Sequence, residues 1–187
     1  MRRALLFLAF LSLPAVAAEV AGVPVDDRAK LEGGELVLNG AGLRTKYFLS
    51  IYVAGLYLTE KKATPADILA MPGPKRITMR LMRNVSAKQL TDALEVGIQA
   101  NTTAVEREAL ADRLSELAAT MNAIKSAKEG DLIALDWLPG TGTRIVLNGE
   151  PRGKIIAGED FYRALLRIWL GDEPAQEKLK KALLGGG

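Results

Sequence analysis

The hydrophobic and polar positions of this chain predict a set of strands interrupted by two helical blocks. The run from Ser50 to Leu58 is apolar at nearly every position, which is typical of a strand buried on both faces. The segment from Lys75 to Met82 alternates charged and apolar residues, as a half-solvated strand does. Further strands are predicted at Val20–Val25, Glu35–Leu38, Asp131–Leu135, Thr143–Leu147 and Gly153–Ile156, with Asn148-Gly149 as a hairpin turn.

Apolar residues at helical spacing, behind hydroxyl caps, predict the helices. Thr64-Pro65 begins a short helix, Ser86 caps a helix that runs to Ala100, and a second long helix spans Ala104 to Ile124. Their expected buried stripes are Leu90, Ala93, Leu94, Gly97 and Ile98, and Val105, Leu110, Leu114, Leu117, Ala118 and Met121. Two helices end the chain, Glu159–Leu170 closed by Gly171 and Ala175–Leu184 opened by Pro174. This order of strands, helices, strands and helices favours an α+β fold with helices packed on an antiparallel sheet.

The N-terminus has the pattern of a secretory signal. Arg2 and Arg3 precede an apolar run from Ala4 to Leu13, which is about half the length that spans a bilayer. Small residues follow Pro14, and we expect cleavage near Ala17 or Ala18; the alternative is an uncleaved anchor. The chain is therefore expected to divide into a signal peptide, residues 1–18, and one domain, residues 19–187, that is periplasmic or secreted.

Composition excludes many kinds of chemistry. The chain has no Cys and no His, so it holds no disulfide, thiolate nucleophile, Ser-His-Asp triad or imidazole metal ligand. Without Arg2 and Arg3 the formal net charge falls from +3 to about +1, and no basic cluster indicates nucleic acid. We expect no cofactor, no metal and no nucleic-acid partner, and membrane contact only through the signal peptide.

Two sequence blocks resemble the chalcone isomerase-like family, in particular its secreted bacterial branch. The first is Asn39-Gly40-Ala41-Gly42-Leu43-Arg44-Thr45-Lys46 followed by Tyr52-Val53-Ala54-Gly55-Leu56-Tyr57-Leu58. The second begins at Gly153-Lys154-Ile155-Ile156 and continues through Phe161, Trp169-Leu170-Gly171-Asp172 and Leu179-Lys180-Lys181-Ala182-Leu183. The resemblance implies an open-faced β-sandwich, a long antiparallel sheet covered by helices, with a cleft between them.

The resemblance also implies a site residue. In the plant enzymes of the family, an arginine in a Gly-Ala-Gly-x-Arg stretch holds the substrate, and Arg44 matches it after an expected turn at Gly40–Gly42. A guanidinium suits this role because it stays charged and forks onto an oxyanion or carboxylate. Tyr52 stands where the enzymes have a threonine. The enzymes' tyrosine and asparagine fall at Val85 or Ser86 and at Asp92 or Ala93, and their late threonine falls at Ile168.

Three functions remain open. The first is a non-catalytic binder of a small apolar anion, such as a fatty acid, in a cleft near Arg44 and Tyr52. The second is an intramolecular lyase or isomerase that uses Arg44 to stabilise an oxyanion. The third is a structural or interaction module whose cleft is filled by its own side chains. Thr45, Tyr47, Arg80 and Arg83 are expected either to line the mouth of a cleft or to form a solvated strand face.

Overall fold

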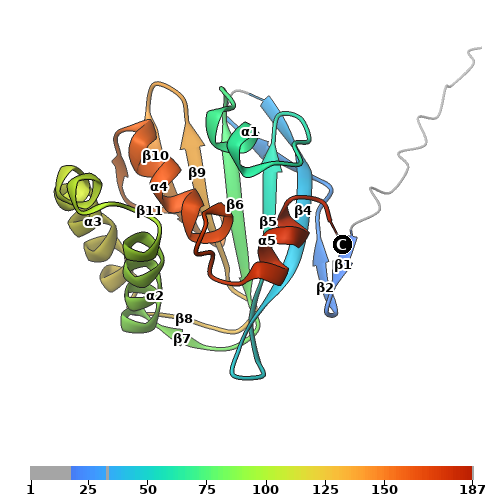
Figure 1. The fold of residues 1–187 in the computed structure, drawn as a ribbon. Coiled ribbons are helices and arrows are strands. Elements are labelled where there is room, and N and C mark those ends of the chain that lie inside the picture. Colours follow the sequence, from blue (N-terminus) through green and yellow to red (C-terminus); the bar gives the residue numbers. More distant parts are fainter. Residues whose placement is uncertain (1–17, 33, 187) are drawn as a thin grey trace, which may run out of the picture.

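The computed structural model describes residues 18–32 and 34–186, which form an α+β fold (Figure 1). Its main strands are β3 (Arg28–Leu31), β4 (Gly34–Lys46), β5 (Leu49–Leu58), β6 (Lys75–Leu81), β9 (Leu132–Leu138), β10 (Gly142–Leu147) and β11 (Glu150–Ile156). Within the described residues these seven strands form one sheet in the order β11-β10-β9-β6-β5-β4-β3, and every pairing is antiparallel. Two short hairpins accompany the sheet, β1 (Ala18–Val20) with β2 (Val23–Val25) and β7 (Val85–Ser86) with β8 (Ser126–Ala127).

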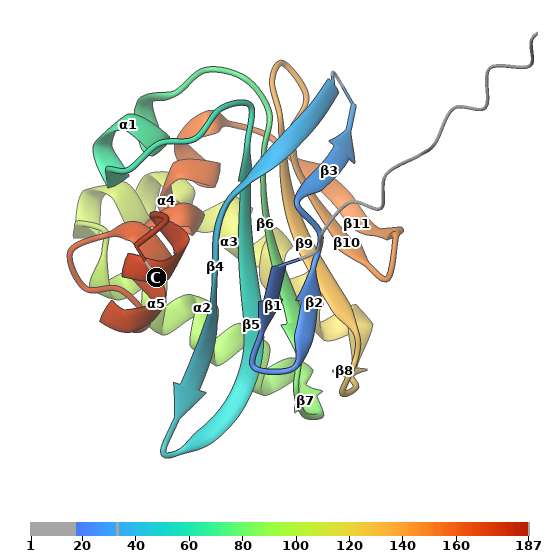
Figure 2. The same ribbon diagram turned by 90° about the vertical axis from the view of Figure 1, so that its right-hand side faces the viewer.

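The helices gather on one side of the sheet and the β1–β2 hairpin lies on the other (Figure 2). They are α1 (Pro65–Ala70), α2 (Ala87–Ala100), α3 (Ala104–Ile124), α4 (Glu159–Leu170) and α5 (Glu177–Leu183). The expected antiparallel sheet with a helical layer is confirmed.

Strand β5 is buried on both faces, as its continuous apolar sequence predicts. Residues 53–58 are all buried. Leu56 and Leu58 belong to the large core cluster under the helices, whereas Val53 and Tyr57 belong to a smaller cluster on the opposite face. Successive side chains of β5 therefore point alternately toward the helices and toward the opposite face of the sheet.

The expected turn at Gly40–Gly42 is wrong, because these residues lie inside the thirteen-residue strand β4. Because these two glycines have no side chain, α5 can approach the strand closely. A Cβ atom at Gly40 would lie 2.1 Å from the carbonyl oxygen of Ala182, and one at Gly42 would lie 2.7 Å from the Cβ of Ala182. The glycines therefore let α5 rest directly on the backbone of β4.

Local capping signals place most helix starts correctly. Ser86 and Thr103 each form a capping box at the start of α2 and α3. The expected stripes are wrong at Ala93 and Val105, which are exposed. The last helix begins at Glu177, not at Ala175 as predicted, because Ala175 donates its N–H to the carbonyl of Ile168 and lies in a loop.

One hairpin turn was predicted from the sequence and another was not. Asn148-Gly149 joins β10 to β11 with both residues at positive φ, as predicted. The segment from Val20 to Val25 is a hairpin, β1–β2, and not one strand, because Ala21 and Gly22 form a turn at positive φ.

The expected signal peptide, residues 1–18, lies outside the described residues except for Ala18. Ala18 pairs with Val25 in the β1–β2 hairpin, so cleavage after Ala17 would keep this pair and cleavage after Ala18 would remove it. Among the described residues, no helix is long and apolar enough to cross a membrane.

A buried ion cluster joins three neighbouring strands on the face away from the helices. Asp136 on β9 is 0% exposed and stands opposite Arg76 on β6 and Arg144 on β10. Its carboxylate accepts two bonds from Arg76, at 2.5 Å from Nε and 2.7 Å from Nη2, and one at 3.3 Å from Nη2 of Arg144. This cluster fixes the middle of the sheet, well away from the site expected at Arg44.

Candidate functional site

The two residues expected in the site, Arg44 and Tyr52, face each other across the ladder of β4 and β5. Their chain neighbours Leu43 and Val53 pack in the cluster on the far face. Since side chains alternate along a strand, Arg44 and Tyr52 point toward the helices. A one-residue register shift between Arg44 and Thr45 lies beside this pair.

Arg44 is half-buried, and within residues 18–32 and 34–186 it bonds only to neutral oxygens. Its Nη1 donates to the carbonyl of Thr45 at 2.7 Å and reaches Oε1 of Gln176 at 3.5 Å. The same Oε1 accepts the backbone N–H of Thr45 at 3.0 Å, and Nε2 of Gln176 donates to the Thr45 hydroxyl at 3.0 Å. Among the described residues no carboxylate forms an ion pair with Arg44, whereas Arg76, Arg113, Arg144 and Arg167 each have one.

Tyr52 connects Arg44 to helix α4. The indole nitrogen of Trp169 donates to the Tyr52 hydroxyl at 2.9 Å. Burial raises the pKa of Tyr52 above 10.0, although the bond from Trp169 and the nearby charge of Arg44 act in the opposite direction. The hydroxyl is therefore neutral at physiological pH and serves as a hydrogen-bonding group, not as a base.

This pKa shift predicts how stability depends on alkaline pH. A tyrosine whose folded pKa is raised stabilises the fold fully below its unfolded pKa of about 10, and this stabilisation is lost as pH rises through the folded pKa. Tyr52→Phe should cost about 1–3 kcal/mol at pH 7, because the buried Trp169 N–H loses its acceptor. Above pH 10 the free energy of unfolding should fall less steeply with pH in the variant than in the parent chain. Urea unfolding from pH 8 to pH 11.5 measures how the free energy of unfolding depends on pH in both proteins. Parallel curves would contradict the raised pKa of Tyr52.

Several residues that the resemblance placed near Arg44 lie elsewhere. Ser86 caps α2, and Asp92 forms an ion pair with Lys88 on the same helix. Ile168 packs against α2, where a Cβ at Gly97 would lie 2.7 Å from its Cγ2. None of these side chains supplies a polar partner to Arg44 in the bonds described above.

The residues expected at the mouth of a cleft lie in different parts of the structure. Thr45 joins the Arg44 site through Gln176. Arg80 lies on the other face of the sheet and donates to the carbonyl of Gly130. Tyr47 is exposed at the end of the β4–β5 hairpin.

Gln176 and Trp169 are members of the site that sequence reasoning did not identify. Gln176 lies 131 residues from Thr45 along the chain, and Trp169 lies 117 residues from Tyr52. Trp169 lies within the helix predicted at Glu159–Leu170, but its hydrogen bond to Tyr52 has no local signal. Gln176 follows Pro174 in a loop and has no signal of its own.

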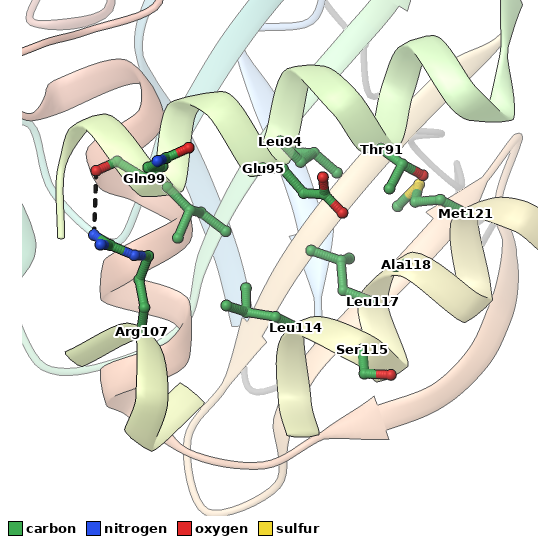
Figure 3. A pocket seen from close by; sticks show the side chains of 11 residues that line it. Thr91, Leu94, Glu95, Gln99, Arg107, Leu114, Ser115, Leu117, Ala118 and Met121 are labelled. Atoms are coloured by element: carbon green, nitrogen blue, oxygen red, sulfur yellow. Dashed lines mark hydrogen bonds between the residues drawn. The ribbon is translucent and has the colours of Figure 1, made fainter. Parts of the chain in front are cut away.

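The structure also contains a groove between α2 and α3, with a volume of about 470 Å³ (Figure 3). Leu94, Ile98, Leu114, Leu117 and Met121 line it, and Arg107 lies at one end, donating to the carbonyl of Gln99. A smaller cavity of about 220 Å³ lies on the far face of the sheet, beside Tyr57 and Arg76. Neither of these two cavities is lined by Arg44 or Tyr52, which bond instead to the chain's own Gln176 and Trp169.

No group of three or more acidic, Cys or His side chains gathers as a metal site within residues 18–32 and 34–186. The polar groups next to Arg44 are a phenol, a hydroxyl, an amide and an indole. This arrangement can bind an anion, and it offers no group with the pKa of a general base at neutral pH.

Comparisons with known proteins agree with the observed fold. A family model described as chalcone isomerase-like matches residues 17–185. No curated protein sequence matches the chain. Among solved structures, a fatty-acid-binding protein of Arabidopsis thaliana has the same fold, with a TM-score of 0.68 and 14% sequence identity; the match covers 87% of this chain and 92% of that one.

Proposed function

The chain belongs to the chalcone isomerase-like family, and we propose that it is a non-catalytic binding protein for a small apolar anion such as a fatty acid. The observation that carries the proposal is Arg44, a half-buried guanidinium whose bonding partners are all neutral. A half-buried cation without a counter-ion favours an anionic ligand, because pairing offsets part of the cost of its desolvation. The fold it shares with a plant fatty-acid-binding protein supports the same ligand class.

Gln176 holds the position that a ligand carboxylate would take. Its amide oxygen accepts from the Thr45 N–H at 3.0 Å and lies at 3.5 Å from Arg44, a long contact. A carboxylate has the same planar shape as this amide and carries the charge that the amide lacks, so it forms stronger bonds to the same donors. Ligand binding therefore displaces Gln176 from Arg44 and from the Thr45 N–H.

The direction of entry follows from the packing of α5. Beyond Gln176 this helix lies directly on Gly42 and Gly40, so the ligand does not pass along β4 in that direction. Burial of an acyl chain contributes about 0.8 kcal/mol per methylene, and the pairing with Arg44 about 1.5–3 kcal/mol. The apolar part therefore dominates affinity, and Arg44 sets the orientation of the carboxylate.

Export is part of the proposal. The basic pair and apolar run at the N-terminus support passage into the periplasm or beyond. An envelope location would place the protein beside membranes, which hold fatty acids.

The displacement of Gln176 can be tested with two variants. Gln176→Glu places a carboxylate of the chain itself on Arg44, so it should weaken fatty-acid binding roughly tenfold by competition. Gln176→Ala removes the group to be displaced and should leave the affinity within about threefold of the parent. Calorimetric titration with a long-chain fatty acid measures the affinities, and thermal unfolding checks that both variants fold. Equal affinities in Gln176→Glu and Gln176→Ala would contradict competition at Arg44.

A second function is favoured by the same contacts. Tyr52, Trp169 and Gln176 fill the space beside Arg44, as a structural module with a closed cleft would require. In that case the parent chain and both Gln176 variants would take up no ligand in the titration. Catalysis has less support, because the raised pKa of Tyr52 keeps its hydroxyl protonated at neutral pH, so it does not serve as a general base there.

A further inference from the structure

The end of the β4–β5 hairpin exposes three consecutive apolar side chains. Tyr47 is 83% exposed, Phe48 is 104% exposed and Leu49 is 51% exposed. The hairpin projects beyond the neighbouring strands at the bottom of Figure 1, and it does so again in Figure 2. The other large apolar side chains exposed in the described residues are Val96, Val105 and Ile155, which lie singly on α2, α3 and β11. Scattered apolar residues are ordinary on a protein surface, but a cluster of this kind marks an interaction site.

The turn that carries this cluster has an unfavourable sequence for its conformation. Lys46 pairs with Leu49, so Tyr47 and Phe48 form a two-residue loop, with φ values of 48° and 67°. Such loops prefer Asn-Gly, which the same chain uses at residues 148–149. Bulky aromatic residues at positive φ are strained, and strain of this kind persists where a function requires the side chains.

Near its tip, the hairpin itself carries only positive charge. The sequence has no acidic residue between Glu35 and Glu60, while Arg44 and Lys46 lie on the hairpin. The ammonium of Lys46 lies over the Tyr47 ring, 5.8 Å from its centroid. Apolar and aromatic side chains flanked by a lysine match the boundary between lipid headgroups and acyl chains, where the lysine extends to the phosphates.

We propose that the hairpin tip, defined as Lys46–Leu49, docks on an anionic lipid surface and inserts Phe48 and Leu49 below the headgroups. The patch is small, three side chains on a narrow turn, whereas a stable protein interface buries about 800 Å² on each partner. A bilayer needs no matching surface and accepts a small apolar tip with an adjacent cation. This contact differs from the expectation that only the N-terminal segment touches a membrane.

Docking at this tip also deepens the proposed function, and this part rests on that function. Arg44 and Tyr52 lie on the same two strands, one register shift away from the tip. The ligand enters from this direction once Gln176 has moved off Thr45 and Arg44, because α5 closes the other direction. A fatty acid therefore passes from the membrane to Arg44 along the hairpin that is docked there.

The absence of cysteine from the full chain allows a local readout. A polarity-sensitive fluorophore is attached to the full chain at Phe48→Cys and, as a matched control, at Val105→Cys, an exposed apolar site on another element. With vesicles of phosphatidylcholine and phosphatidylglycerol, emission at position 48 should shift to the blue, and emission at position 105 should stay unchanged. Vesicles of phosphatidylcholine alone should bind the tip roughly fivefold more weakly, because Lys46 loses the anionic headgroups. An unchanged spectrum at position 48 overturns the proposal and favours a protein partner for the hairpin tip.

A second variant separates docking from folding. Tyr47→Asn combined with Phe48→Gly installs the preferred turn, so the melting temperature should rise by about 3–6 °C. The rate at which the protein takes up fatty acid from anionic vesicles should fall about tenfold, since the apolar tip is lost. Its equilibrium affinity for fatty acid without vesicles should be unchanged. A lower melting temperature together with an unchanged uptake rate would show that the aromatic residues serve stability alone.

The outcomes for docking and for fatty-acid binding are distinguishable. A chain that binds fatty acid while position 48 stays in water keeps the proposed function and loses the docking site. A chain whose position 48 enters the bilayer but that binds no fatty acid keeps the docking site and loses the proposed function.

Discussion

Arg44→Met is expected to weaken fatty-acid binding by about 10- to 100-fold while the protein remains folded. A hydrogen bond between a partly buried guanidinium and a carboxylate contributes about 1.5–3 kcal/mol, and each 1.4 kcal/mol changes affinity tenfold. Methionine keeps most of the length of the arginine side chain, so the loss reports the charge and its donors and not a cavity. Calorimetric titration with a saturated fatty acid measures the difference directly.

Three controls define this result. Arg152→Met removes an exposed arginine from β11, at the opposite edge of the sheet, and should leave the affinity unchanged. Arg44→Lys keeps the charge but loses the forked donor geometry, so its affinity should lie between those of the parent and Arg44→Met. An uncharged alcohol with the same alkyl chain should bind the parent and Arg44→Met equally. Parent-like affinity for the fatty acid in Arg44→Met would remove Arg44 from the site.

Asp136→Ala is expected to lower the free energy of unfolding by about 3–5 kcal/mol. The substitution leaves Arg76 and Arg144 partly buried without the carboxylate that both contact, and breaking a buried pair from one side is costly. Arg144 keeps its exposed partner Glu32, which offsets part of the loss. Urea unfolding at pH 7 measures the change.

Asp160→Ala is the matched control, because Asp160 accepts two bonds from Arg113 in a similar forked geometry. Its carboxylate is 62% exposed, so removing it should cost no more than about 1 kcal/mol. Equal costs for the two substitutions would mean that burial does not distinguish these ion pairs. Fatty-acid affinity should be unchanged in Asp136→Ala, since the ion cluster lies on the face away from Arg44.

Local sequence patterns predicted the elements whose causes are local. The continuous apolar run of β5 reflects burial on both faces, and Ser86 satisfies the first backbone donors of α2 with its own side chain. Asn148-Gly149 forms its turn because both residues tolerate positive φ. Each of these signals acts within a few residues, so reading the sequence alone suffices.

Features that depend on distant partners were not predictable. Gly40 and Gly42 have the composition of a turn, yet they lie in a strand because α5 packs on them. Gln176 has no pattern that connects it to Thr45, because the contact arises only when the C-terminal loop folds over β4. The Tyr47-Phe48 turn runs against local preference, so its conformation follows from the pairing of β4 with β5.

The most direct test is mass spectrometry of small molecules extracted from the purified protein after denaturation. The chain and its Arg44→Met variant are expressed and purified in parallel under gentle, detergent-free conditions. The account predicts a fatty acid or similar anionic lipid near one molecule per chain in the parent, and a marked depletion in the variant. Equal lipid content in both proteins would show that lipid binding does not depend on Arg44. A parent that carries no ligand and also takes up no added fatty acid would contradict the central claim and favour a structural module.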